Sequence, residues 1–507
     1  MQRGHVKIRI LDEVSMVVVG LTDDHVKHFY ETYGVYAPNY FFNPKFKLGQ
    51  WDGKIRYFYK TAKTYLYLID DILPRIVQLG YKVEIDDLRP SDVAKPKPIQ
   101  ADIFKHIIHM ETGEPIILRD DQVDGVNILI EHGYGICVAG TGAGKTFMCA
   151  ALVTAYGELG VKSLTIVPDQ GLIRQTRLEY INCQLNVGEY SGTHKTLNHQ
   201  HVVSTWQALQ NNPKIVNMFD MVIVDECHGL RGNVLSNIVI DHAGKMPHRF
   251  GFTGTLPKEP ADLMSVHVAV GPMRHEVRAR ELIDKGVLAN MNIDIIQLEE
   301  DLKDEWTSYC KNEAVGKPPT YVQFKDGYFP DYASEKSFLR HNDNRVEWIA
   351  RYIETKRDSK KGNVLCLVDN IIFGRKLTAE IEGAIFVNGK DIKSPIQRQK
   401  VYDMFKEHND LVVIATVHIA GTGLNIRRIF NLMMLDMGKS FIRVIQAIGR
   451  GLRRAEDKDS VTITDICSDL KYGKRHCRQR INHYNEAQYP HKKYKVDYME
   501  QLRSVEL

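Results

Sequence analysis

The chain lacks the features that mark membrane-spanning and disulfide-bonded proteins. It has no run of about 18 apolar residues, the length that a membrane-spanning helix needs, and its N-terminus lacks the charged-then-apolar pattern of a secretory signal. Its eight cysteines include no C-x-x-C pair, and several lie inside apolar runs, as Cys137 does. We therefore expect reduced, buried thiols, no membrane partner and a cytoplasmic location, in the cytoplasm of the host cell if a phage encodes the chain.

An excess of charge of one sign is also missing, because 67 Lys and Arg residues face 63 Asp and Glu residues. The formal net charge is +4, so a bound polyanion would need positive charge gathered in one place. The sequence has no internal repeat of fixed period and no low-complexity tract. With 507 residues, 43% of them hydrophobic, the chain is long enough for about three domains and is expected to fold throughout.

What the sequence does contain is a series of short apolar runs, separated by amphipathic stretches of helical length. This alternation is typical of parallel strands buried between helices. A polar stretch around Pro318 and Pro319 divides the runs into two groups, so we predict two α/β lobes with a connector between them. The runs are Ile136–Val138, Leu164–Val167, Met221–Val224, Val364–Val368, Leu411–Ala415 and Asn431–Leu435.

A glycine-rich stretch follows the first of these runs and precedes Phe147–Val153, which can be helical. In such a P-loop the glycines let backbone N–H groups surround phosphates, the lysine reaches the β- and γ-phosphates, and the threonine hydroxyl binds Mg²⁺. The strict pattern starts with glycine where this chain has Ala139, a position that offers phosphates no side chain. We predict an ATP and Mg²⁺ site rather than a plain glycine-rich turn. Its residues are Gly140, Thr141, Gly142, Ala143, Gly144, Lys145 and Thr146.

Two adjacent carboxylates end the run Met221–Val224. Asp225 can hold Mg²⁺, and Glu226 can orient and deprotonate the attacking water, because phosphoryl transfer needs one group for the metal and another for the nucleophile. An acidic strand end beside a loop is common by itself. The P-loop upstream favours the catalytic interpretation.

The stretch Asp225-Glu226-Cys227-His228 resembles the DExH box of superfamily two helicases, and other motifs follow in that family's order. The resemblance implies two tandem RecA-like lobes that close on one ATP. It also implies that Gln122 reads adenine and that Thr253-Gly254-Thr255 couples ATP to nucleic acid. The residues that it implies along the nucleic-acid track are Pro168, Gln175, Thr205 and Gln207.

The second lobe carries the remaining motifs of this family. Gln446-Ala447-Ile448-Gly449-Arg450-Gly451-Leu452-Arg453 matches Q-x-x-G-R-x-x-R, which implies Gln446, Arg450 and Arg453 as catalytic residues, with Arg453 the favoured arginine finger. Thr416 and Gly421–Asn425 resemble the motif that contacts both the phosphate backbone and the ATP cleft, so Gly423 is assigned to the nucleotide and Thr416 to nucleic acid. A basic helix end with solvated arginines is the alternative.

The N-terminal region places six cations and one acid between residues 45 and 63, with aromatic residues among them. This mixture suits phosphates and exposed bases. The stretches Phe42–Phe46 and Gly49–Arg56 resemble the N-terminal domain of UvsW-type phage DNA helicases, which remodel recombination and replication-fork intermediates. The resemblance implies a small α+β domain that contacts DNA through Trp51, Lys54 and Arg56, although each aromatic could instead belong to the core.

We therefore predict an N-terminal substrate-binding domain over 1–95, RecA-like lobe 1 over 96–295, a connector over 296–340, RecA-like lobe 2 over 341–480 and a basic tail over 481–507. The tail and the residues before it carry eight cations and one acid between 471 and 495, which suits phosphate binding or a merely solvated surface.

The predicted function is that of an ATP-dependent DNA helicase that unwinds or branch-migrates forks and Holliday-type junctions. Three alternatives remain: an RNA helicase, a translocase that moves along double-stranded DNA without separating it, and a nucleic-acid-binding module with vestigial ATP motifs. The complete motif set from Lys145 to Arg453 speaks against the last.

Overall fold

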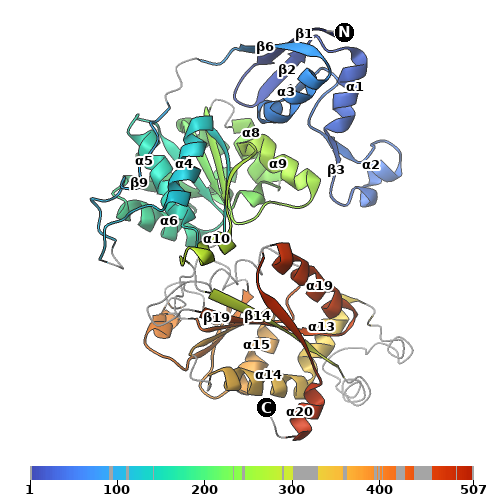
Figure 1. Ribbon diagram of the computed structural model, residues 1–507, viewed down its shortest axis with the longest axis vertical. Coiled ribbons are helices and arrows are strands. Elements are labelled where there is room, and N and C mark those ends of the chain that lie inside the picture. The colour runs from blue at the N-terminus through green and yellow to red at the C-terminus, as the bar shows by residue number, and fades with distance from the viewer. Residues whose placement is uncertain are drawn as a thin grey trace. The chain divides into compact units, whose positions relative to one another are not determined.

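The computed structural model describes most of the chain as two compact units, Met1–Val277 and Arg278–Leu507 (Figure 1). Among the described residues, no helix is long and apolar enough to cross a membrane. Seven cysteines are described, and all are free and buried. The described residues are 3–90, 95–109, 113–140, 142–231, 233–242, 246–287, 290–300, 329, 331–357, 362–392, 397, 400, 401, 403–417, 429–438, 460–486 and 488–504.

The first unit begins with a small α+β domain, as predicted. Its sheet has the order β5-β2-β1-β6, in which β1 and β6 are parallel and the other neighbours antiparallel. Alternate residues of β1, namely Val6, Ile8 and Ile10, are buried beneath helices that contribute Phe29 and Ile72. The elements are β1 (Arg3–Ile10), β2 (Ser15–Val19), α1 (Asp23–Thr32), β3 (Gly34–Tyr36), η1 (Tyr40–Phe42), α2 (Pro44–Lys47), β4 (Lys54–Arg56), β5 (Lys63–Tyr65), η2 (Leu66–Leu68), α3 (Ile69–Gln78) and β6 (Tyr81–Asp87).

Residues 34–56, which we call the arm, extend from this domain as the antiparallel pair β3 and β4 with α2 between them (Figure 1). The arm has its own small cluster of aromatic rings. Tyr40 stacks on Tyr36 and meets Phe46 edge-on, with ring centroids 4.6 and 4.8 Å away. Gly53 has φ +80° and lies against the Tyr40 ring, which would be 2.5 Å from an added Cβ, so this turn requires glycine.

Aromatic rings and cations join the N-terminal domain to the lobe that follows it. Tyr67 stacks on Tyr134 with ring centroids 4.2 Å apart, and Arg249 Nε donates a hydrogen bond of 2.9 Å to the Tyr67 hydroxyl. Arg274 forms a salt bridge of 2.6 Å with Asp70. Because Tyr67 and Arg249 are buried in this interface, the domain and the lobe form one packed unit.

The rest of the first unit is a RecA-like lobe with seven parallel strands in the order β13-β7-β12-β11-β8-β10-β9. The predicted strands Ile136–Val138, Leu164–Val167 and Met221–Val224 lie in β7, β8 and β11. Every residue of β8 and β10 is buried, because helices cover both faces of a parallel sheet. The elements are α4 (Asp120–His132), β7 (Tyr134–Ala139), α5 (Lys145–Gly157), β8 (Ser163–Val167), α6 (Gln170–Asn182), β9 (Val187–Tyr190), β10 (His201–Thr205), α7 (Trp206–Gln210), η3 (Pro213–Met218), β11 (Met221–Asp225), η4 (Cys227–Arg231), α8 (Asn233–His242), β12 (His248–Thr253), α9 (Pro260–Val270) and β13 (Met273–Val277).

The second unit contains another parallel sheet of seven strands, with the order β16-β17-β15-β18-β19-β14-β20. The predicted strands Val364–Val368, Leu411–Ala415 and Asn431–Leu435 correspond to β15, β17 and β18. The elements are α10 (Ala279–Asp284), β14 (Asn290–Leu298), α13 (Tyr332–His341), α14 (Asp343–Lys356), β15 (Val364–Val368), α15 (Ile371–Ala379), β16 (Ile385–Val387), η7 (Met404–Lys406), β17 (Val412–Thr416), β18 (Asn431–Leu435), β19 (Ser460–Ser468), α19 (Lys471–Glu486), β20 (His491–Val496) and α20 (Tyr498–Ser504).

Two strands of this sheet lie outside the predicted limits of lobe 2. The predicted lobe 1 extends to residue 295, yet β14 pairs with β19 along its whole length. The predicted tail 481–507 contains β20, which pairs with β14, and α20, whose Tyr498 is fully buried. The second sheet therefore begins before residue 295 and includes much of the tail. The sequence did not predict this, because β14 forms its hydrogen bonds with strands that lie far along the chain, and no local pattern indicates such pairing.

Buried ion pairs join distant segments of the second unit. Arg345 pairs with Glu300 at 3.0 Å and with Asp436 at 2.8 Å. Arg480 of α19 pairs with Asp465 of β19 at 2.8 Å, and neither side chain is more than 1% exposed. Because removing one partner of a buried pair leaves an uncompensated charge, we interpret Arg345 and Arg480 as structural cations.

His201, the first residue of β10, gives the first unit a pH-dependent stability. Its ring is buried, with Nδ1 2.8 Å from the Ser163 hydroxyl, and burial lowers its pKa from 6.5 to about 4. The unfolded chain takes up a proton near pH 6.5, whereas the folded chain does so only near pH 4. The stability that this neutral ring contributes is therefore complete above pH 6.5 and is lost as the pH falls toward 4.

We expect this one group to lower the free energy of unfolding by about 2 kcal/mol between pH 7 and pH 5. The variant His201→Asn cannot take up the proton, so its loss over the same range should be smaller by about that amount. Urea unfolding of both proteins, followed by circular dichroism at the two pH values, measures the difference. Equal losses in the two proteins would contradict this assignment.

Candidate functional site

The carboxyl edge of the first sheet brings the predicted motifs together. Because all its strands are parallel, the residues that follow them meet at one edge. The P-loop follows β7, Thr253 ends β12, and Asp225 ends β11, and these three strands are neighbours. Next to them lie β8 and β10, which lead to Pro168 and Thr205. The predicted ATP motifs and the predicted nucleic-acid motifs are far apart in the sequence, yet they lie at one edge of the sheet.

The P-loop is a tight turn that ends where α5 begins. Gly142 and Gly144 have φ of +87° and +79°, in the left-handed region that favours glycine. An added Cβ on Gly144 would be 2.2 Å from the side-chain nitrogen Nε2 of Gln122. Lys145 and Thr146 are the first two residues of α5, whose first backbone N–H groups lack helical partners and can face an anion. Thr141 lies outside the described residues.

Gln122 is tied to the P-loop backbone. Its Nε2 donates to the Ala143 carbonyl at 3.0 Å, and its Oε1 accepts from the Arg119 N–H at 3.0 Å. The Arg119 guanidinium donates to the same carbonyl at 2.7 Å and is held by Asp121. The structure thus places Gln122 beside the P-loop, as the predicted adenine-reading residue would need.

The acid pair faces the P-loop lysine. Lys145 Nζ lies 3.3 Å from Glu226 Oε1, and His228 Nδ1 lies 3.3 Å from Glu226 Oε2. The Glu226 N–H donates to Asp225 Oδ1 at 2.9 Å. Glu226 has φ +51°, a left-handed conformation that costs a non-glycine residue about 1–2 kcal/mol. Such strain is typical of functional positions.

The two carboxylates have opposite protonation tendencies. Burial, and then the charge of Glu226, raise the pKa of Asp225 to about 6. Burial also acts to raise the pKa of Glu226, but the Lys145 ammonium and His228 outweigh it and bring this pKa to about 2. A proton shared by the pair therefore resides on Asp225, and Glu226 is the ionised member.

Thr253 and Gly254 link the acid pair to the P-loop. Thr253 Oγ1 lies 3.0 Å from His228 Nδ1 and 3.4 Å from Glu226 Oε2. A Cβ on Gly254 would be 3.9 Å from Lys145 Nζ, so this glycine passes directly beside the lysine. The predicted coupling motif therefore contacts the acid and approaches the lysine.

The predicted nucleic-acid residues of this lobe follow β8 and β10, the strands next to those that carry Lys145, Glu226 and Thr253. Thr205 pairs in register with Val167, and its side chain accepts from the Ala208 N–H to begin α7. Gln207 is exposed and its Nε2 donates to the Pro168 carbonyl at 3.2 Å. Pro168, Thr205 and Gln207 therefore form one group, while Gln175 lies half-buried within α6.

The structure decides which of the N-terminal aromatics belong to the core, the interpretation that the sequence left open for each of them. Tyr57 and Phe58, which the sequence groups with the interleaved aromatics, are 4% and 0% exposed and belong to the core of this domain. Tyr36 and Tyr59 are exposed, at 52% and 41%, and so are Phe41 and Phe42 on η1, at 49% and 66%. Their adjacency to Lys45 and Lys47 is visible in the sequence, but no periodic pattern distinguishes them from core residues.

The three predicted DNA contacts of the arm are partly engaged within the protein. Trp51 is half-buried and its indole N–H donates to the Lys54 carbonyl at 2.9 Å. Lys54 and Arg56 pair with Glu31, and Arg56 also stacks on the Tyr30 ring, 4.3 Å from its centroid. With only 11% of its side chain exposed, Arg56 stabilises the base of the arm.

In the second unit, Thr416 ends β17 at the carboxyl edge of its sheet and is 8% exposed. The other predicted residues of this lobe lie outside the described residues. They are Gly423, Gln446, Arg450 and Arg453.

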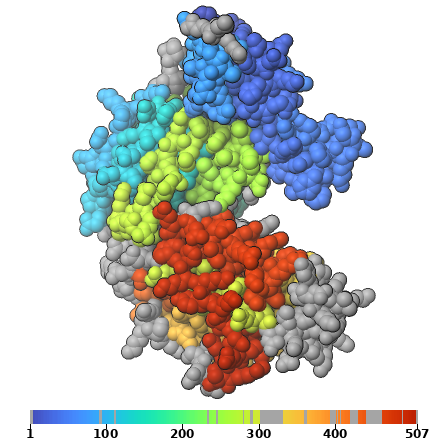
Figure 2. Space-filling model, turned by 45° about the vertical axis from the view of Figure 1, so that its right-hand side comes forward, coloured from blue at the N-terminus to red at the C-terminus, as the bar shows by residue number. Residues whose placement is uncertain are grey.

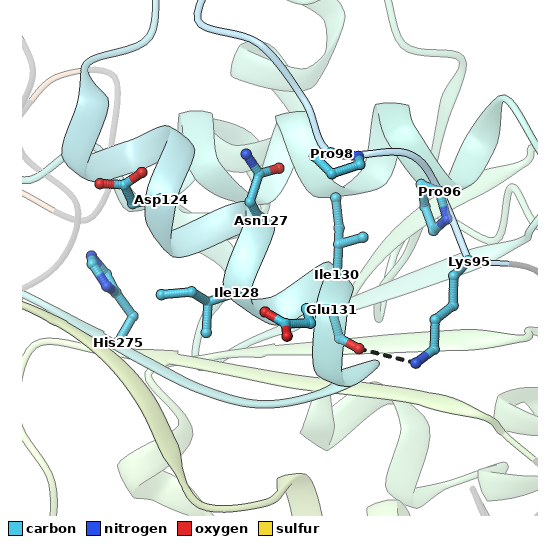
Figure 3. A pocket seen from close by; sticks show the side chains of 9 residues that line it. All are labelled: Lys95, Pro96, Pro98, Asp124, Asn127, Ile128, Ile130, Glu131 and His275. Carbon is cyan, nitrogen blue, oxygen red and sulfur yellow. Dashed lines mark hydrogen bonds between the residues drawn. The ribbon is translucent and has the colours of Figure 1, made fainter.

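A cavity of about 500 Å³ lies on another side of α4 (Figure 3). At 100° per residue, the α4 residues that line it, among them Asn127 and Glu131, face away from Gln122. Lys95 closes one end by donating to the Glu131 carbonyl at 3.0 Å, and His275 lies at the other. This cavity is therefore separate from the set around Lys145.

Three family models match the chain. Residues 5–86 match the N-terminal domain of DNA helicase UvsW, residues 95–258 match the res subunit of type III restriction enzymes, and residues 345–455 match the helicase conserved C-terminal domain. The ATP-dependent DNA helicase uvsW of Enterobacteria phage T4 is 25% identical over 451 residues, which are 85% of this chain and 84% of that protein. The chain is a helicase with a UvsW-type N-terminal domain.

More distant relatives agree with this family. The DNA 3′-5′ helicase XPB of Kineococcus radiotolerans is 23% identical over 368 residues, 69% of this chain and 60% of that protein. The structure of the ATP-dependent type ISP restriction-modification enzyme LlaBIII bound to DNA matches with a TM-score of 0.57 and 14% identity, covering 84% of this chain and 34% of that one. That likeness shows the two-lobe fold. As a UvsW-type helicase, the chain is an ATP-dependent DNA helicase.

Proposed function

We propose that this UvsW-type helicase uses ATP to unwind or branch-migrate branched DNA, such as forks and four-way junctions. One observation carries the motor part of the proposal. Lys145, Glu226 and Thr253 form a connected set, and the strands next to it lead to Pro168 and Thr205 on the same sheet edge. An ATP site and a nucleic-acid track on one rigid edge suit a protein that converts hydrolysis into movement.

The residues present fit a nucleotide triphosphate with Mg²⁺. Gly140 has nothing within 4 Å of where a Cβ would be, so phosphates can approach the backbone there. The Thr146 hydroxyl and the Asp225 carboxylate are the oxygen ligands that Mg²⁺ prefers. Bound Mg²⁺ would neutralise charge on the β- and γ-phosphates.

The contact between Lys145 and Glu226 suggests how the base becomes active. While the ammonium lies against Glu226, it holds the pKa of that carboxylate low and makes it a poor proton acceptor. Phosphates that draw Lys145 away would raise the pKa of Glu226, with His228 still orienting it. Glu226 could then take a proton from the attacking water, and the predicted arginines of lobe 2, Arg450 and Arg453, would stabilise the transferring phosphoryl group.

Two substitutions separate these roles. Lys145→Ala should abolish ATP turnover, because it removes the P-loop cation expected at the β- and γ-phosphates. Glu226→Gln should retain ATP binding but slow hydrolysis by about 10²-fold or more, because the amide cannot accept the proton. Binding of a fluorescent ATP analogue and steady-state hydrolysis, measured on both variants, test this. Loss of ATP binding in Glu226→Gln would show that the assigned role is wrong.

The DNA part of the proposal depends on the arm. Lys45 and Lys47 are exposed on α2, next to the exposed rings of Phe41 and Phe42. Cations beside exposed aromatic rings suit the phosphates and the unstacked bases that a branch point offers. The match of residues 5–86 to the UvsW N-terminal domain favours DNA over RNA as the substrate.

Arg56 is held by Glu31 and the Tyr30 ring, so its substitution would also disturb the arm. Lys45 and Lys47 therefore test better whether the positive charge of the arm binds DNA. Lys45→Gln with Lys47→Gln should lower the dependence of junction affinity on salt, by up to about 2 in the slope of log K against log salt concentration. Junction unwinding should fall further than ATPase stimulated by single strands. Lys27→Gln with Lys82→Gln, which removes two exposed lysines from α1 and β6, is the control. Equal slopes in both double variants would show that the arm does not contact DNA.

We also infer that the protein works in a reducing compartment such as the cytoplasm. The seven free, buried thiols support this, because stable disulfides are characteristic of oxidising compartments.

A further inference from the structure

The C-terminal elements α19 and β20 carry a concentration of positive charge that the helicase motifs do not include. Between residues 471 and 496 the sequence has eight Lys and Arg residues and one acid, whereas the whole chain has a formal charge of only +4. Figure 2 shows these elements, in red, as a broad exposed surface of the second unit. The question is which of these cations are structural and which are available to a ligand.

The helix separates the two kinds of cation by its faces. His476, Cys477, Arg480 and Tyr484 are buried against the sheet, and Arg480 is neutralised by Asp465. The exposed cations occupy a different side of α19, within about 100° of its circumference at 100° per residue. They are Lys471, Lys474, Arg475 and Arg478.

The strand adds cations to the same face of the second sheet. Asp465, Ile295 and Lys493 lie in one row across β19, β14 and β20. Because Asp465 holds Arg480, α19 covers this face of the sheet, and Lys493 therefore points to the same side. Lys495, two residues on, does so as well. We call the exposed cations of α19 together with Lys493 and Lys495 the basic face.

The basic face has little to neutralise it within the part of the chain that the structure describes. Lys474, Arg478 and Lys493 are exposed and form no salt bridge with any described side chain. Like charges four residues apart on one helix, as in Lys474 and Arg478, repel each other. A surface of this kind is matched by a partner with regularly repeated negative charge.

The geometry points to the phosphate backbone of duplex DNA as the ligand of the basic face. Sites for single strands use exposed aromatic rings on which bases stack. Here Tyr484 is fully buried, and Tyr472 is flanked by Lys471 and Arg475, whose cationic groups lie 5.4 Å from its ring centroid. Tyr494 of β20 is 45% exposed, but it points to the opposite face from Lys493 and Lys495, because side chains alternate along a strand. Cations without free rings on their own face suit contacts that position a duplex without reading its sequence.

This inference rests on the proposed function, because it assigns a duplex arm of the branched substrate to the second lobe. The basic face lies away from Thr416, which ends β17 several strands along the sheet. It would hold the duplex while the arm of the N-terminal domain and the motif track contact the branch point and the strand. A duplex fixed at one more place cannot rotate freely about the branch point.

The test removes three of these charges without disturbing the core. In the triple variant Lys474→Gln, Arg478→Gln and Lys493→Gln, all three side chains are exposed. The control removes the same number of cations, although Arg351 and Arg375 pair with Glu347 and Asp391, and is Arg351→Gln, Arg375→Gln and Lys390→Gln. These residues are also exposed and belong to α14, to α15 and to the segment after β16. Because α14 and α15 pack on the opposite face of the sheet, Arg351 and Arg375 carry two of the three control charges on the other side of the lobe.

Duplex binding, measured by fluorescence anisotropy over a salt series, tests whether the basic face binds the phosphate backbone. The slope of log K against log salt concentration should be smaller by about 2 to 3 in the triple variant, and unchanged in the control. Binding of a single strand of the same length should change less. An unchanged duplex slope, or an equal loss on single strands, would overturn the assignment. Fork unwinding by the unaltered protein is measured in parallel, because its absence would contradict the proposed function rather than the basic face.

Discussion

The contact of Lys145 with Glu226 is the interaction on which the functional site depends. It joins the loop after β7 to the loop after β11, and its 3.3 Å distance requires that β12, the strand between them, be in register with both. The parallel sheet supplies that register, and the helices on both faces exclude water from the strands. Thr253, at the end of β12, is therefore positioned to contact Glu226 and His228 together. The geometry of the proposed ATP site therefore depends on the strand order as well as on the residues of the site.

The same contact explains why the two acids differ. One ammonium close to Glu226 keeps that carboxylate charged, while burial and the neighbouring charge move the proton to Asp225. Below about pH 6, where Asp225 keeps its proton, the one ionised acid is held by the lysine and no carboxylate charge is left without a partner. The site is also responsive, because any anion that competes for Lys145 alters the proton affinity of Glu226, the proposed base.

Much of this could be predicted from the sequence, because the P-loop and the acid pair are local patterns attached to apolar runs. The strands β7, β8, β11, β15, β17 and β18 were predictable for the same reason. The places of β14 and β20 were not, since they depend on pairing between distant segments. Nor does composition separate Phe58, which is fully buried, from Phe42, which is 66% exposed. Composition does not separate structural cations from exposed ones either. Arg56 and Arg480 both lie in basic stretches, yet each is paired with a carboxylate inside the protein.

The central claim is that an ATP-driven motor of this family acts at branch points, and one comparison tests it most directly. ATP hydrolysis and strand separation should be measured on a matched set of a fork, a four-way junction, a linear duplex and an RNA duplex of the same base-pair length. The account predicts ATP-dependent unwinding of the fork and the junction at rates well above that of the linear duplex, with no unwinding of the RNA duplex. Equal rates on the fork and the linear duplex, or unwinding of the RNA duplex as fast as the fork, would contradict it.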